Sequence, residues 1–141
     1  MMIEDFDYYL RQNLAKREVP NSGIAESLFS KAKRRIERIE TEQISERNSD
    51  LIFEDAYEAC REACQSLMAK AGYKPLSHEA LLSFLVKFYK NDFPSHMVAE
   101  LDRYRKLRNL SVYEARLASM NDAKLAVVLS MTIIKIVGVM L

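Results

Sequence analysis

The chain has 141 residues, of which 49% are hydrophobic and 29% are charged, with only three glycines and three prolines. This balance is typical of a helix-rich globular protein and excludes disorder beyond the termini, and the length suits one domain, residues 1–141, that buries its core without metal or disulfide staples. The 21 Lys and Arg against 20 Asp and Glu leave a formal net charge of +1, so any attraction to nucleic acid or to a membrane must be local.

The N-terminal part of the chain predicts two helices. Apolar residues at helical intervals predict the first over 4–16, and the sequence Pro-Asn-Ser-Gly at 20–23 breaks the chain after it. Ser22 can cap the second helix. Its inward stripe has five members at helical spacing: Ile24, Leu28, Ala32, Ile36 and Ile39. Its basic residues alternate with glutamates, so we interpret them as a solvated face.

Two more helices follow in the middle of the chain. The sequence Arg-Asn-Ser-Asp at 47–50 supplies cap chemistry for the third helix, which keeps the 3.6-residue period until Gly72 stops it. Ser77 can cap the fourth helix, predicted over 78–90. Cys60 and Cys64 lie four residues apart on the third helix without further ligands nearby. We therefore expect two reduced core thiols and no metal site.

The C-terminal part predicts a fifth helix from Ser95 to about Leu117 and a sixth, strongly apolar helix after Ser119 and Asp122, which can cap it. The apolar stretch of the last helix covers residues 125–141 and has Lys135 well inside it. Its length is at or below that of a membrane-spanning helix, and such a helix rarely contains a lysine. We therefore expect that this helix does not span a membrane, and that the bundle or a partner subunit buries it.

Taken together, these segments predict an all-α fold, an up-and-down bundle of five to six antiparallel helices without a β-strand. The acidic N-terminus lacks the apolar segment of a secretory signal, which with the free cysteines favours a cytoplasmic protein. His78 and His96 each follow a cap residue and are expected to be exposed. Because the chain has no Gly-rich phosphate loop, nucleophile elbow or metal-ligand set, we expect no cofactor.

The densest polar cluster is the sequence Arg-Tyr-Arg-Lys-Leu-Arg-Asn-Leu-Ser-Val-Tyr at 103–113. On a helix, Arg105, Asn109 and Tyr113 repeat every four residues and share one face, with Arg108 beside them. Arginine matches phosphate oxygens, asparagine can bind a base or sugar, and a tyrosine ring can stack on a base. The same pattern also fits a solvated helix face, so two interpretations remain open.

Two segments resemble the HEPN family, small helical-bundle domains of prokaryotic toxin–antitoxin and nucleotidyltransferase-linked systems. Residues 56–81 are similar to its central helix, turn and next helix, and Leu-Arg-Asn-Leu-Ser-Val-Tyr at 107–113 is similar to its Arg-Asn-x-x-x-His signature near a helix end. Together the segments span about residues 50–120. The resemblance implies that, in active members, the Arg and His of the motif from two subunits meet at a dimer cleft and cleave RNA without a metal.

That cleavage would start with attack of a 2′-hydroxyl on the adjacent phosphate, while His moves protons and Arg stabilises the developing charge. Arg108 and Asn109 match the motif, but Tyr113 stands at the His position. Because tyrosine titrates near pH ~10 against ~6.5 for histidine, it shuttles protons poorly at neutral pH. Ribonuclease activity is therefore expected to be impaired or lost.

Three hypotheses follow. The first is a HEPN-like homodimer that binds RNA or a nucleotide, possessing at most weakened toxin-type ribonuclease activity. The second is a non-catalytic module that docks a nucleotidyltransferase antitoxin. The third is a structural bundle in which Arg105 and Arg108 pair with carboxylates such as Asp102 or Glu114. The first assigns catalytic positions to Arg108 and Tyr113, and binding positions to Arg103, Arg105, Lys106 and Asn109.

Overall fold

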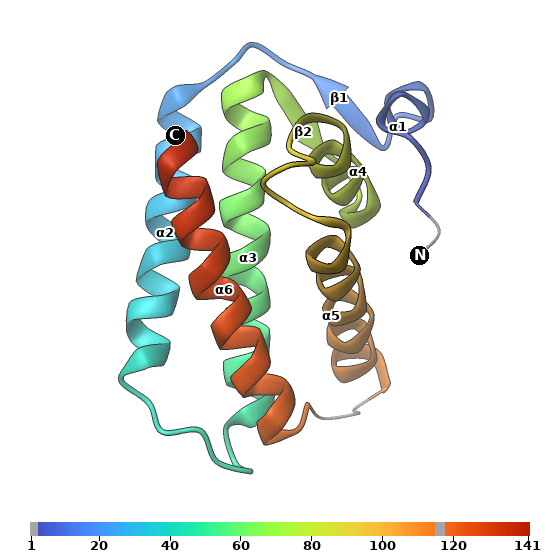
Figure 1. Ribbon diagram of the computed structural model, residues 1–141. Coiled ribbons are helices and arrows are strands. Elements are labelled where there is room, and N and C mark those ends of the chain that lie inside the picture. The colour runs from blue at the N-terminus through green and yellow to red at the C-terminus, as the bar shows by residue number, and fades with distance from the viewer. Residues whose placement is uncertain (1–2, 115–117) are drawn as a thin grey trace.

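The computed structural model describes residues 3–114 and 118–141, without the side chains of 111–114. Within them the chain folds as the predicted all-helical bundle, with one small two-stranded sheet (Figure 1). The helices are α1 (Phe6–Arg11), α2 (Ser22–Glu40), α3 (Ser49–Ala71), α4 (His78–Phe88), α5 (Ser95–Glu114) and α6 (Met120–Met140). The strands are β1 (Ala15–Arg17) and β2 (Tyr73–Pro75).

The long helix α3 is the centre of the bundle. It packs along α2 and α6 and also contacts α4 and α5 (Figure 1). Its apolar residues occupy most of its circumference, and Phe53, Leu67 and Met68 are completely buried. Cys60 and Cys64 are buried in the same helix, as predicted. One polar face of α3 remains, and it carries the charged residues that form the site described below.

Three predicted helix ends are confirmed, whereas the expected cap at 47–50 is not, because Asn48 precedes α3 without a side-chain cap hydrogen bond. Ser77 caps α4 by accepting a hydrogen bond from the backbone N–H of Ala80, and Ser119 forms a capping box with Asp122 at the start of α6. Gly72 ends α3 with φ of 91°, a left-handed conformation that favours glycine.

The start of α2 differs from the prediction. Asn21, and not Ser22, is its N-cap, because the Asn21 side chain accepts a hydrogen bond from Ile24 N–H at 2.9 Å. The buried stripe accordingly begins at Ala25, while the side chain of Ile24 is 51% exposed. An apolar side chain thus stands at the surface in the first turn of this helix.

The prediction that no segment forms a strand was wrong. Helix α1 ends at Arg11 because Asn13 adopts a left-handed conformation with φ of 58°, and Leu14 N–H then bonds the Tyr9 carbonyl oxygen. The chain continues extended as β1, which pairs antiparallel with β2 in the register Ala15 to Pro75. Strands of three residues are too short for an alternating pattern to reveal them.

Helix α6 is buried on one face only. It has 21 residues, and an 18-residue window of it has a mean hydropathy of 2.0, so by length and composition it alone, among the described residues, could cross a membrane. The helix begins after its predicted cap Ser119, before the apolar stretch 125–141 that was compared with the length of a membrane span. Ala126, Leu129, Ile133 and Val137 pack toward α3 and α2, and the opposite face exposes Leu125, Val128 and Val139.

Candidate functional site

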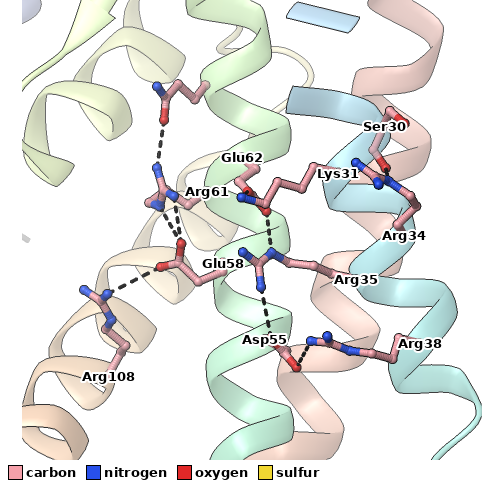
Figure 2. A network of polar contacts seen from close by, with 11 residues as sticks. Ser30, Lys31, Arg34, Arg35, Arg38, Asp55, Glu58, Arg61, Glu62 and Arg108 are labelled. Carbon is pink, nitrogen blue, oxygen red and sulfur yellow. Dashed lines mark hydrogen bonds and ion pairs between the residues drawn. The ribbon is translucent and has the colours of Figure 1, made fainter. Parts of the chain in front are cut away.

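The polar face of α3 lies between α2 and α5. Figure 2 shows Asp55, Glu58 and Glu62 along α3, with arginines of α2 on one side and Arg108 of α5 on the other. Acidic side chains therefore run along the middle of this face, and basic side chains approach it from both neighbours.

The side of this face toward α2 is a closed network of ion pairs. Glu62 is 2% exposed and accepts a hydrogen bond from Arg35 Nε at 2.6 Å, with Lys31 Nζ 3.5 Å away. Arg35 and Arg38 both reach the carboxylate of Asp55, at 3.0 and 2.6 Å. Because the buried carboxylate of Glu62 is hydrogen-bonded, we assign this side to holding α2 against α3.

The side toward α5 is built around Glu58. Its Oε2 atom accepts hydrogen bonds from Arg61 Nε at 3.0 Å and Nη2 at 2.7 Å. Arg108 Nη2 lies 3.6 Å from Oε1, close enough for an ion pair but too far for a hydrogen bond, and the buried Oε1 has no hydrogen-bond partner. Burial raises the pKa of Glu58, but the hydrogen bond from Arg61 and the charges of Arg61 and Arg108 outweigh it and lower that pKa. One carboxylate thus stands between two guanidinium groups.

His78 adjoins this pair of arginines. A cavity of about 250 Å³ is lined by Arg61, Gln65, Ser77 and His78, among others. His78 Nδ1 lies 3.0 Å from the hydroxyl of Tyr57, whose pKa is raised by burial, so that hydroxyl stays protonated. When it donates to Nδ1, the neutral imidazole carries its proton on Nε2. Burial, followed by the charges of Arg61 and Arg108, lowers the pKa of His78, which favours that neutral ring.

The placement of His78 corrects the sequence-based expectation. It was expected to be exposed, like His96, but it is half-buried against Tyr57. Among the described residues, no group of three or more His, Cys, Asp or Glu side chains is arranged to hold a metal ion. The chemistry of this site is therefore best argued from its arginines and its histidine.

Of the residues predicted on α5, only Arg108 joins this site directly. Arg105 donates to Asp102 at 2.9 and 3.1 Å and pairs with Glu79 at 3.2 Å. Lys106 pairs with the same Asp102 at 3.2 Å. Burial raises the pKa of Asp102, but its hydrogen bonds from Arg105 and Lys106 outweigh burial and lower it. These two cations are held by carboxylates, as the third hypothesis expects for Arg105.

The remaining predicted residues either lie away from this site or have side chains outside the described residues. Arg103 is exposed, with its guanidinium carbon 5.0 Å from the ring centre of Tyr104, and about 200° around the helix from Arg105. Asn109 is half-buried next to Arg108. The side chains of Tyr113 and Glu114 lie outside the described residues, so their predicted roles stay predictions.

Three residues of the site were missed by the sequence reasoning. Glu58 and Arg61 are one turn apart on α3, and His78 opens α4, so nothing in their local spacing connects them to Arg108. The cap signal at Ser77 did place His78 correctly at a helix start, but not beside two arginines. No family model, curated protein or solved structure matches the chain.

Proposed function

We propose that this protein is a HEPN-like domain that binds the phosphate group of RNA or of a nucleotide at Arg61, His78 and Arg108. The observation that carries the proposal is the convergence of Arg61 and Arg108 on one carboxylate beside a cavity. A guanidinium group matches the oxygens of phosphate as it matches those of carboxylate. A phosphate that enters the cavity can therefore take over donors that Glu58 now engages.

Glu58 has two opposing effects in this proposal. Its carboxylate orients Arg61 through two hydrogen bonds, which lowers the cost of ordering that side chain when a ligand arrives. Its negative charge also competes with the ligand for both arginines. The resemblance at residues 107–113, which includes Arg108 and Asn109, supports RNA as the phosphate-bearing ligand.

Cleavage of bound RNA would need a side chain that moves protons. Tyr113 occupies the motif position, and His78 is the histidine at the site. With Tyr57 donating to Nδ1, the other ring nitrogen, Nε2, carries a proton, so His78 can donate to a phosphate oxygen but cannot accept a proton from a 2′-hydroxyl in this arrangement. We therefore propose binding as the function and treat ribonuclease activity as impaired or lost.

The first test is RNA binding by the wild-type protein. Fluorescence anisotropy with labelled single-stranded RNA should show binding at low salt that weakens as salt rises. If two arginines each neutralise one phosphate, the logarithm of the association constant should fall with the logarithm of salt at a slope of about −1.4. Failure to retain RNA at the lowest salt would contradict the proposal, and a denaturing gel of the recovered RNA reports any cleavage.

We also propose that the protein is a homodimer that covers the exposed face of α6. Val128 is 62% exposed and Val139 is 89% exposed, and Leu125 lies on the same face. The exposed residues Thr132 and Lys135 lie between the two valines, so this face is mixed, and a second copy would remove its apolar side chains from water. The docked nucleotidyltransferase suggested by the resemblance is the alternative occupant of this face.

Light scattering should accordingly give the mass of a dimer, and Val128→Glu should shift it toward the monomer, because a charge would be buried in the interface. Val86→Glu places the same charge at an exposed apolar position of α4, away from the exposed face of α6, and as the control it should leave the mass unchanged. A wild-type protein that stays strictly monomeric at high concentration would show that no second copy covers this face.

A further inference from the structure

A second cavity adjoins the first across one side chain. It measures about 260 Å³, and its lining includes Val19, Ile24, Leu28 and Tyr73. Gln65 lines both cavities, and its Oε1 accepts a hydrogen bond from Arg61 Nη1 at 2.8 Å. The cationic group in the first cavity is Arg61, beside Ser77, His78 and the apolar residues Pro75, Leu76 and Leu81. The second cavity has an apolar part, formed by four aliphatic side chains and the ring of Tyr73, and a polar part, formed by Glu18, Asn21, Gln65 and Lys74.

The wall of the second cavity is held in place by the backbone. Glu18 N–H donates to the Gly72 carbonyl oxygen at 2.8 Å, and Asn21 N–H donates to the Ala69 carbonyl oxygen at 3.0 Å. A Cβ atom at position 72 would lie 2.8 Å from the Glu18 carbonyl oxygen, so this close approach requires glycine. The segment between these bonds is therefore preformed, which reduces the entropy that a ligand must overcome.

This fixed wall presents apolar side chains to solvent. Val19 is 84% exposed although Glu18 before it is bonded to Gly72 and Asn21 after it to Ala69, and Ile24 is 51% exposed in the first turn of α2. Neither side chain contributes to the buried core. An apolar ligand surface placed here would remove both from water.

We propose that the second cavity binds the base of a nucleotide whose phosphate lies at Arg61 and Arg108, an inference that rests on the proposed function. A base has apolar faces that suit Ile24 and Leu28, and polar edges that the amide of Gln65 can bond. Each cavity alone is smaller than the usual ligand pocket of about 300–1,000 Å³, and the two together fall within that range. The ligand class is therefore a nucleotide that lies across Gln65, and not a phosphate alone.

The test compares ligands with and without a base. Isothermal titration calorimetry would measure the affinity of ribose 5-phosphate and of the four ribonucleoside 5′-monophosphates. We expect at least one nucleotide to bind about tenfold tighter than ribose 5-phosphate, or better. Ile24→Asn should remove most of that difference and leave the affinity for ribose 5-phosphate within about twofold.

The matched control is Leu51→Asn, which changes a 60% exposed apolar residue near the other end of α3 without altering charge. It should keep the full difference between nucleotides and ribose 5-phosphate. Three results would each overturn the base site. They are equal affinities for all five ligands, no loss of the difference in affinity between nucleotides and ribose 5-phosphate in Ile24→Asn, and no binding of any monophosphate at millimolar concentration.

The failure of this inference can be told apart from failure of the proposed function. If ribose 5-phosphate binds and Arg61→Ala abolishes its binding, the phosphate site stands even when the base adds nothing. If neither RNA nor any of these five ligands binds at low salt, the phosphate site and the base site both fall.

Discussion

Arg35→Met is expected to lower the free energy of unfolding by about 3 kcal/mol, because removal of one partner leaves a buried carboxylate poorly compensated. Glu62 is 2% exposed, and Arg35 donates to it at 2.6 Å. Lys31 remains, but its Nζ is 3.5 Å away and its side chain is 57% exposed, so it can compensate only in part. Urea denaturation followed by circular dichroism measures the change.

Arg34→Met is the matched control for this prediction. Arg34 is the neighbouring residue on α2 and is exposed, and within the described part of the chain it donates only to the carbonyl oxygen of Ser30, so its replacement should change stability by less than about 0.5 kcal/mol. The double variant Arg35→Met/Glu62→Leu should recover most of the loss, because it removes the buried charge as well. Equal effects of Arg35→Met and Arg34→Met would refute the assignment of this ion pair to holding α2 in place.

Arg61→Ala and Arg108→Ala are each expected to weaken RNA binding about tenfold or more, since a hydrogen bond to a charged group contributes roughly 1.5–3 kcal/mol. Glu58→Gln should act in the opposite direction and tighten binding. It removes the negative charge that now engages Arg61 at 2.7 Å and lies 3.6 Å from Arg108. Anisotropy titrations at one fixed low salt concentration compare these variants with the wild type.

Arg103→Ala separates a specific site from a general effect of charge. It removes one positive charge from α5, as Arg108→Ala does, but Arg103 is exposed and lies over the ring of Tyr104. Its affinity for RNA should stay within about threefold of the wild type, because Arg103 lies about 140° around the helix from Arg108 and would not contact a phosphate held at that site. If Arg103→Ala and Arg108→Ala weaken binding equally, the RNA is held by the overall charge of the helix and not at the proposed site.

The helices were predictable because their signals are local. Ser77, Ser119 and Gly72 each act within one turn of the helix they begin or end, and the structure confirms all three. The strands were not predictable, because β1 and β2 are three residues long and pair across most of the first half of the chain. Their pairing depends on where α1 ends, which a left-handed Asn13 determines.

The candidate site was predictable only in part, for a related reason. Arg108 could be singled out because it is one of four basic residues within positions 103–108 and matches the resemblance at 107–113. Its neighbours Glu58, Arg61 and His78 come from α3 and α4, and periodicity within one helix carries no information about such contacts. The ion pair between Arg105 and Asp102, in contrast, joins residues three apart on one helix, and the structural hypothesis could name it.

The pairing of β1 with β2 has a consequence for how the protein can be shortened. Leu76 N–H donates to the Leu14 carbonyl oxygen at 2.9 Å, directly before the turn into α4 that positions His78. The residues before α2 are therefore part of the support for the phosphate site, although none of them belongs to it. Trimming the chain to begin at Ser22 would leave β2 as an open strand edge and release the start of α4, so studies of binding need the N-terminal segment intact.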